Sequence, residues 1–178
     1  MSGRESETVY TIGHSTRPAD EFVTILNAYA IELVADIRTI PRSRRNPQYD
    51  QESLKRVLAE HHIGYVHLPA LGGLRHPRKD SPNSGWTNAS FRGYADYMQT
   101  AEFAGAIDDL ITRAASSQTA IMCAEAVPWR CHRSLVGDAL LVREIQVEDI
   151  ISAKSVKPHR LTGWARVEGL RITYPAPE

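Results

Sequence analysis

The chain has 178 residues, and its 21 Lys and Arg residues balance 21 Asp and Glu residues, so its formal net charge is zero. That length suits one domain whose hydrophobic core needs no metal or disulfide for stability. The neutral balance argues against a broad electrostatic contact with nucleic acid or an anionic membrane. The chain contains no stretch of about 18 apolar residues and no signal-peptide core. We therefore expect a cytoplasmic protein with no membrane partner.

The first third of the chain predicts two strands and two helices. Residues 8–14, TVYTIGH, form a short apolar stretch typical of a strand, and Pro18 suits the first turn of a following helix. Residues 31–38, IELVADIR, have the continuous apolar character of a buried strand. Helical spacing of leucine and valine then predicts a helix over 51–61.

The same alternation continues through the rest of the chain. It predicts strands over 64–69, 119–125 and 147–151, and helices over 101–115 and from about 132 to 144. Strand and helix in turn favour a single α/β domain over 1–178, with an open, mostly parallel sheet and helices on both faces.

Two segments interrupt this alternation. Residues 72–93 form a long polar insertion, which we expect to be a mobile lid with Trp86 as its apolar contact. The tail over 152–178 has weak patterning and suggests a hairpin near Glu168 and Gly169 that packs across the domain.

Polar side chains follow the predicted strands at their carboxyl ends. In open parallel sheets these ends meet at one edge, where ligands bind. The residues expected at this edge are Gly13, His14 and Ser15 after the first strand, Asp36 and Arg38 after the second, His67 after the third, Cys123 and Glu125 after the fourth, and Arg130 to Arg133 beyond them.

The two cysteines lie eight residues apart. In a reducing compartment they are free thiols, metal ligands or catalytic groups rather than a disulfide. Cys131 precedes a predicted helix, whose N-terminal dipole would favour its thiolate, so we expect it to be the more reactive thiol. Cys123 lies in an apolar run and has the alternative role of a small buried hydrophobic residue. Cys131 has the alternative of a local structural or capping role.

Two chemical interpretations of this edge remain open. Cys123, Cys131 and His132, with His14 or His67, suit zinc or iron, but their spacing matches no usual zinc pattern, so we expect no tightly bound metal and no cofactor. Alternatively, the start of the helix at His132, together with Arg38, Arg130 and Arg133, offers backbone donors and guanidinium groups to phosphate. Structural roles remain for the same residues: His132 as a solvated first-turn residue, and Asp36 and Arg38 as a simple ion pair.

Five separated motifs carry a family resemblance. They are YTIGHS, LVADIRTIPRSRRNPQY, HLPALGGLR, WTNASFRGYADYM and MCAEAVPWRCHRSL. They resemble the bacterial and archaeal domain-of-unknown-function family numbered 488, from about Val9 to the final ITYP. The resemblance implies an α/β fold and no assigned reaction. Its motif positions are His14, Ser15, Asp36, Arg38, Pro41, Pro69, Gly72, Gly73, Arg75, Tyr94, Cys123, Glu125, Cys131, His132, Arg133 and Ser134.

The sequence therefore predicts a polar pocket that binds a small anionic ligand, such as a nucleotide or a nucleic-acid end. We expect Cys131 or Cys123 as nucleophile, His14 or His132 as proton carrier, and Glu125 and Asp36 as carboxylates of the site. Binding residues are expected at Ser15, Arg38, Arg75, Arg130, Arg133 and Ser134, with Arg133 and Arg38 as the anion clamps. The oligomeric state is left open.

Two other functional classes fit the same residues. One is a metal-dependent hydrolase or a thiol redox protein that uses Cys123 and Cys131. The other is a non-catalytic nucleic-acid module, in which Trp86, Arg92, Tyr94 and the basic loop from Arg75 to Lys79 would stack on bases and contact phosphate.

Overall fold

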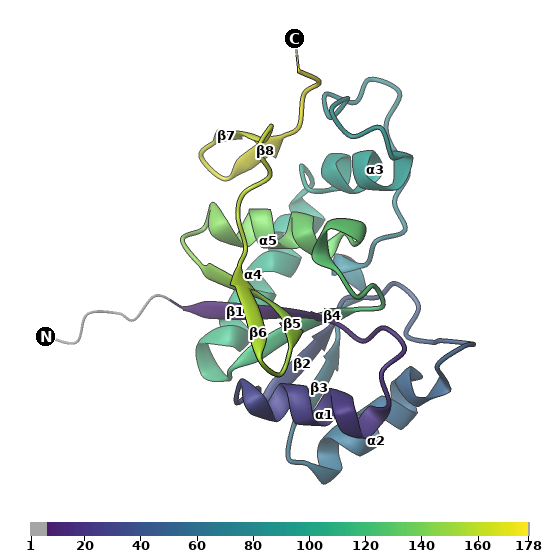
Figure 1. Cartoon of the computed structure of the whole chain (residues 1–178). Coiled ribbons are helices and arrows are strands. Elements are labelled where there is room, and N and C mark those ends of the chain that lie inside the picture. Colours follow the sequence, from purple (N-terminus) through teal and green to yellow (C-terminus); the bar gives the residue numbers. More distant parts are fainter. Residues whose placement is uncertain (1–6, 178) are drawn as a thin grey trace, which may run out of the picture.

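Six strands form one sheet in the order β3-β2-β4-β1-β5-β6 in the computed structural model, which describes residues 7–177 (Figure 1). Every neighbouring pair is parallel except β5 and β6, which are antiparallel. The strands are β1 (Thr8–Gly13), β2 (Leu33–Asp36), β3 (Gly64–His67), β4 (Thr119–Cys123), β5 (Gln146–Ser152) and β6 (Ser155–Pro158). The predicted α/β class with a mostly parallel sheet is confirmed.

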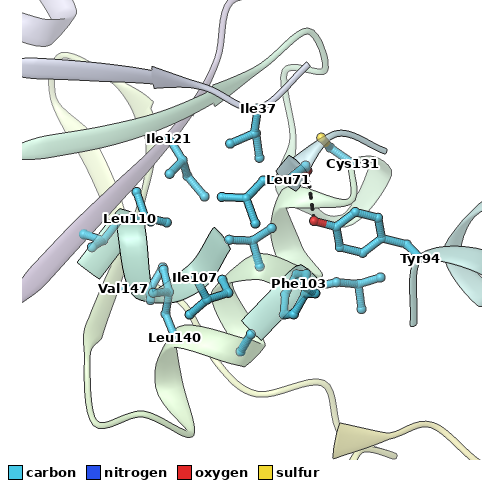
Figure 2. Close-up of a cluster of buried hydrophobic side chains, with 14 of the residues drawn as sticks. Ile37, Leu71, Tyr94, Phe103, Ile107, Leu110, Ile121, Cys131, Leu140 and Val147 are labelled. Carbon is cyan, nitrogen blue, oxygen red and sulfur yellow. Dashed lines mark hydrogen bonds between the residues drawn. The ribbon is translucent and has the colours of Figure 1, made fainter. Parts of the chain in front are cut away.

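Helices cover both faces of this sheet, as expected (Figure 1). On one face, α1 and α2 pack their buried leucines and Phe22 against Ile12, Val34 and Met122. On the other face, α3, α4 and α5 enclose the larger core, which Figure 2 shows around Leu110, Ile121 and Val147. The helices are α1 (Ala19–Ala28), α2 (Gln51–Glu60), α3 (Ala89–Tyr97), α4 (Ala101–Ser116) and α5 (Arg133–Leu141).

Local sequence explains where several helices begin. Pro18 stands at the N-cap of α1, where its missing N–H costs no hydrogen bond. The Thr100 hydroxyl accepts from the Phe103 N–H at the start of α4, and the Asn88 side chain accepts from two amides at the start of α3. Three short 3-10 helices, Pro47–Tyr49, Pro69–Leu71 and Pro128–Arg130, each begin with proline.

The long insertion differs from its prediction as a loop. Its last part belongs to α3, whose first residue is Ala89, and its earlier part is held by hydrogen bonds to that helix. The Asp96 carboxylate accepts from the Arg78 backbone N–H, the Ser81 hydroxyl and the Asn83 amide, and Asn83 is fully buried. Buried polar groups satisfied in this way fix a backbone, so we now expect a docked segment rather than a mobile lid.

The C-terminal part contains the expected hairpin and one strand that the sequence pattern missed. β7 (Arg166–Glu168) pairs with β8 (Arg171–Thr173), and Gly169 occupies the turn with a φ of +61°, a conformation that favours glycine. The strand expected over 147–151 is present as β5, and the unexpected β6 turns back beside it. Among residues 7–177, the helices include none with the length and apolar character that crossing a membrane demands.

Candidate functional site

A pocket of about 510 Å³ opens at the carboxyl ends of β2 and β4. The chain leaves β2 toward the face covered by α1 and α2, and leaves β4 toward the face covered by α5. Such a divergence of neighbouring connections opens a crevice beyond the strand ends. This cavity, here called the thiol pocket, is lined by Arg38, Thr39, Ile40, Arg42, Gly73, Leu74, Asn88, Ser90, Phe91, Cys123, Ala124, Glu125, Arg130, Cys131 and His132.

Cys123 ends β4 and meets the guanidinium group of Arg133. The Arg133 Nη1 lies 2.9 Å from the Cys123 Sγ, and Arg133 is completely buried. Burial of Cys123 favours its neutral thiol, but the Cys131 side chain and the Arg133 charge outweigh that effect and lower the Cys123 pKa to about 7. The Cys131 side chain and the Arg133 charge therefore favour a thiolate at Cys123 near neutral pH.

Cys131 lies beside Cys123 and precedes α5. As expected, its sulfur meets the start of a helix, because the Arg133 backbone N–H lies 3.4 Å from the Cys131 Sγ. Burial and the neighbouring Cys123, however, raise the Cys131 pKa well above its ordinary value. These pKa directions favour Cys123 over Cys131 as the thiolate, and the greater reactivity expected for Cys131 stays a prediction.

The His132 ring lies between the Cys131 sulfur and the backbone that follows β2. Its Nε2 lies 3.0 Å from the Ile37 carbonyl oxygen and its Nδ1 lies 3.5 Å from the Cys131 Sγ. Donation from Nε2 to the carbonyl leaves Nδ1 as an acceptor for the Cys131 thiol hydrogen. Burial lowers the His132 pKa to about 4, so the ring is neutral at neutral pH.

A glycine at the end of β1 permits this packing. A Cβ built on Gly13 would meet the backbone oxygen of Glu125 and the Nη1 of Arg133 at distances that no side chain tolerates. The β4–α5 connection therefore lies directly on β1, and backbone hydrogen bonds from His14 to Cys123 and from Ser15 to Ala124 hold it there. Close approach, and not a turn, is the reason for glycine at this position.

Arg38 lines the opposite side of the pocket and is 6% exposed. It forms a bidentate pair with Asp36, with its Nε and Nη2 at 2.9 and 2.8 Å from the two carboxylate oxygens. The structural ion pair considered from the sequence is thus present. The Arg38 Nη1 is buried without a hydrogen-bond partner among the described residues. Since an unsatisfied buried donor is costly, this atom is suited to a ligand oxygen.

The charge of the lining is mostly positive. Arg38, Arg42 and Arg130 line the cavity, whereas Glu125 is its one carboxylate among the described residues. Arg42 and Arg130 are exposed, so their side chains can adjust to a ligand, and the Glu125 carboxylate also faces solvent. A positively lined pocket with a buried guanidinium donor favours an anion.

The structure brings only part of the predicted site together. Arg38, Cys123, Glu125, Arg130, Cys131 and His132 line the thiol pocket. Asp36 lies behind Arg38, and Ser134 donates its hydroxyl hydrogen to the Cys131 carbonyl. Arg133 lies beneath Cys123 and also donates to the Glu125 and Ala126 carbonyls. The Nη1 and Nη2 of Arg133 thus donate within the protein, while its Nε is buried without a partner among the described residues, and its role as an anion clamp stays a prediction.

His14 and Ser15 lie next to the pocket but do not line it. The His14 ring stacks on Tyr49 with 4.1 Å between centroids, and its Nδ1 lies 2.7 Å from the Ser15 carbonyl oxygen. Its Nε2 is buried without a partner among the described residues, and burial lowers the His14 pKa to about 4. A role for His14 as proton carrier remains a prediction.

Three of the residues expected to contact nucleic acid, Tyr94, Arg75 and Arg92, make contacts within the protein. Tyr94 is fully buried and donates to the Leu71 carbonyl, as Figure 2 shows. The Arg75 guanidinium stacks on the Tyr97 ring at 3.6 Å, and Arg92 donates to the Trp86 carbonyl. A completely buried ring cannot stack on a base, so the assignment of Tyr94 to ligand binding is wrong.

Sequence reasoning missed several residues of the pocket wall. Arg42 follows Pro41 just beyond β2, while Asn88 and Ser90 come from the start of α3. The Asn-x-Ser pattern of a helix cap was the available signal for α3. Among residues 7–177, no three His, Cys, Asp or Glu side chains form a cluster suited to a metal ion.

Comparison with known proteins identifies the family. Residues 18–140 match the family described as domain of unknown function DUF488. The chain belongs to this family. The matched range includes β2, β4, the start of α5 and every residue that lines the thiol pocket, so the DUF488 region contains the candidate site. No curated protein and no solved structure matches the chain.

Proposed function

We propose that this protein is a thiol-dependent enzyme that acts on a small phosphate-bearing substrate. Cys123 is the nucleophile, and the substrate anion binds among Arg38, Arg42 and Arg130. The observation that carries the proposal is the contact between the buried Arg133 guanidinium and the Cys123 sulfur. It favours thiolate at the pH of ordinary assays, and only the thiolate is an effective nucleophile.

The surroundings of Cys123 support an attack on an anionic substrate. A thiolate and an anionic substrate repel each other, so the pocket must supply cations. The Arg38 Nη1, which lacks a protein partner, offers a fixed donor, and the two exposed arginines offer adjustable ones. Preorganised donors of this kind stabilise charge that develops on a transferred group.

The proposed reaction has two steps. First, the Cys123 Sγ forms a bond to phosphorus, the ester P–O bond breaks, and the departing oxygen takes a proton from Glu125 or water. Second, a water oxygen attacks phosphorus, the S–P bond breaks, and phosphate leaves as the thiolate is restored. Glu125 accepts the proton of that water, so no oxidant or reductant is needed.

The nucleophile is tested by alkylation with iodoacetamide as a function of pH, followed by peptide mass spectrometry. We expect Cys123 to react with an apparent pKa near 7, and Cys131 to react slowly over the same range. Arg133→Lys keeps the positive charge but replaces the planar guanidinium group with an ammonium group, so it should raise the Cys123 pKa. Equal and slow alkylation of both thiols would remove Cys123 as nucleophile.

The substrate class is tested by release of phosphate from a panel of nucleoside monophosphates, sugar phosphates and p-nitrophenyl phosphate. Cys123→Ser should abolish release, whereas Cys131→Ser should retain a measurable rate. Arg38→Lys should raise KM more than it lowers kcat, because it weakens ground-state anion binding. Release that survives in Cys123→Ser would overturn the proposed mechanism.

One observation favours a second candidate function, a thiol redox protein. Cys123 and Cys131 are free thiols that both line the thiol pocket, and each shifts the pKa of the other, downward for Cys123 and upward for Cys131. Reactive and resolving thiols in redox proteins share this asymmetry. Titration against dithiothreitol mixtures tests it: a reversible Cys123–Cys131 disulfide with a defined potential favours the redox role, and oxidation only to mixed products excludes it.

A further inference from the structure

A second cavity of about 490 Å³ lies on the other side of the β4–α5 connection. Pro128 and Trp129 of that connection line the second cavity, while the adjacent Arg130, Cys131 and His132 line the thiol pocket. The remaining wall comes from β5, β6 and the segment that follows them, together with Trp86 and with Ser134 of α5. We call it the tryptophan pocket, and it is lined by Trp86, Pro128, Trp129, Ser134, Asp149, Ile151, Lys157, Pro158, His159, Arg160, Thr162, Gly163 and Trp164.

All three tryptophans of the chain line this cavity. Trp86 packs against Trp164 with 5.0 Å between ring centroids, and also against Phe91 and Tyr174, so its position is fixed. Trp129 and Trp164 are 67% and 43% exposed, which is unusual for the largest apolar side chains. Two exposed indoles beside the half-buried Trp86 offer flat apolar surface to a planar ring.

Polar groups of the tryptophan pocket restrict the ligand further. The Trp86 Nε1 is buried and has no hydrogen-bond partner among the described residues, so a ligand carbonyl or ring nitrogen would satisfy it. Lys157 and Arg160 are exposed on the wall and carry positive charge. The Asp149 carboxylate adds little negative charge toward the ligand, because it is paired with the His159 imidazole and the Thr11 hydroxyl.

We propose that the tryptophan pocket binds the base of a nucleotide or of a nucleic-acid end, with Lys157 and Arg160 in contact with its phosphate. A planar heterocycle with hydrogen-bonding edges and an attached phosphate matches flat aromatic walls, an unsatisfied indole N–H and nearby cations. A neutral sugar would stack on the indoles but leave the cations unused. The site is separate from Cys123, and its occupancy does not depend on whether Cys123 is catalytic.

Intrinsic fluorescence tests the site directly, because every tryptophan of the chain reports from this pocket. The four ribonucleoside monophosphates should quench the emission saturably, and adenosine and glucose serve as uncharged comparisons. Trp129→Ala and Trp164→Ala should each weaken binding about tenfold, since loss of a stacking partner has effects of that order. Lys157→Ala and Arg160→Ala should weaken nucleotides but leave adenosine unchanged.

A variant that fills the cavity separates binding from tryptophan removal. A Cβ added at Gly163 meets nothing within 4 Å, so Gly163→Leu should fold and obstruct the pocket while all three indoles remain. Exposed residues outside the pocket wall supply matched controls: Leu170→Ala and Arg166→Ala should bind nucleotides like the wild type. Cys123→Ser should also bind them normally, which distinguishes this site from the proposed thiol chemistry.

Titration with short 5′-phosphorylated oligonucleotides shows whether the ligand is a free nucleotide or a nucleic-acid end. Tighter binding of oligonucleotides than of mononucleotides identifies a nucleic-acid end as the ligand, and equal binding identifies a free nucleotide. Absence of saturable quenching up to about 10 mM of every nucleotide would overturn the proposal, since such affinity is weaker than that of functional small-molecule sites. Unchanged binding in Gly163→Leu, or equal quenching by glucose, would overturn it as well.

Discussion

Two polar clusters of this domain shift the pKa of their histidine in opposite directions. In the thiol pocket, burial lowers the His132 pKa to about 4. Near the C-terminal segment, His159 lies 2.9 Å from one oxygen of Asp138 and 2.9 Å from one oxygen of Asp149. Burial there also disfavours the charged ring, but the two carboxylates outweigh it and raise the His159 pKa to about 9.

The clusters also differ in how completely their polar atoms are satisfied. Asp138 accepts from His159, the Thr162 N–H and hydroxyl, and the Tyr174 hydroxyl, so both of its oxygens are occupied. In contrast, the Arg38 Nη1 in the wall of the thiol pocket has no partner among the described residues. A satisfied cluster stabilises a fold, whereas unsatisfied groups beside a cavity favour a ligand. The four predictions below test this distinction.

The largest effect is expected for Asp138→Asn. Replacing the fully buried carboxylate leaves the His159 charge with one partner and turns an acceptor of Thr162 or Tyr174 into a donor. We expect a loss of about 3 to 5 kcal/mol in the free energy of unfolding, measured by urea denaturation. Asp109→Asn, in the exposed pair with Arg113, is the control and should change stability by less than about 1 kcal/mol. A small effect of Asp138→Asn would show that the cluster is not a stability element.

The free energy of unfolding should fall at both high and low pH, and different groups should cause the alkaline limb and the acid limb of this profile. Because the His159 pKa is raised from 6.5 to about 9, its contribution is present in full below pH 6.5 and is lost as the pH rises toward 9. This difference between the unfolded and folded pKa values of His159 corresponds to about 3 kcal/mol of folding free energy. The lowered pKa values of His132 and His14, each about 4, act in the opposite sense, so stability is lost as the pH falls from 6.5 toward 4.

The two limbs are separable by substitution. Denaturation should be measured in Cys123→Ser, because the lowered Cys123 pKa contributes in the opposite direction above neutral pH. In that background His159→Gln should flatten the alkaline limb and leave the acid limb unchanged. An alkaline limb that persists in His159→Gln would assign it to another group.

Gly13→Ala should have an intermediate effect. The added Cβ collides with the Glu125 backbone oxygen, so the β4–α5 connection must shift away from β1. Overpacking of this kind costs about 1 to 3 kcal/mol, and the shift should also separate Arg133 from Cys123 and raise the thiol pKa. Gly105→Ala, where a Cβ meets nothing within 4 Å, is the control. It should leave the Cys123 pKa unchanged and the free energy of unfolding unchanged or slightly higher. An unaltered Cys123 pKa in Gly13→Ala would contradict the inferred coupling.

The smallest effect on stability is expected for Glu125→Gln. This carboxylate is exposed, so the isosteric amide should change the free energy of unfolding by no more than about 0.5 kcal/mol. Turnover of a phosphate ester should nevertheless fall if Glu125 transfers the proton. Replacement of a carboxylate by the corresponding amide should thus lower stability strongly at Asp138, whereas at Glu125 it should lower only the rate of turnover. Loss of stability in Glu125→Gln would remove that contrast.

The elements that the sequence predicted are those with continuous apolar patterning. The strands at 8–14 and 119–125 and the helices at 51–61 and 101–115 were confirmed within a few residues, because their buried faces follow a regular period. The helix α3 was missed because its buried face is formed by tyrosines within a polar, glycine-containing stretch. β6 was missed because SVKP has no strand period and gains its partners only from β5.

The site was predicted in location but not in chemistry. Parallel strands bring their carboxyl ends to one edge, so Arg38, Cys123 and Glu125 were correctly expected near each other. The assignment of the thiolate required a distance that no pattern contains. Arg133 turns back from the start of α5 toward the end of β4, and this tertiary contact, together with Cys131, favours the Cys123 thiolate.

The antiparallel strand β6 has a consequence for how the sheet ends. Without it, β5 would present a row of unpaired backbone donors and acceptors to any other extended chain. β6 covers that row with only four residues, among them Lys157, which is charged, and Pro158, which has no N–H. A charge and a missing donor discourage further strand addition. At this edge of the sheet, β6 therefore protects the domain from pairing with further strands into a larger assembly.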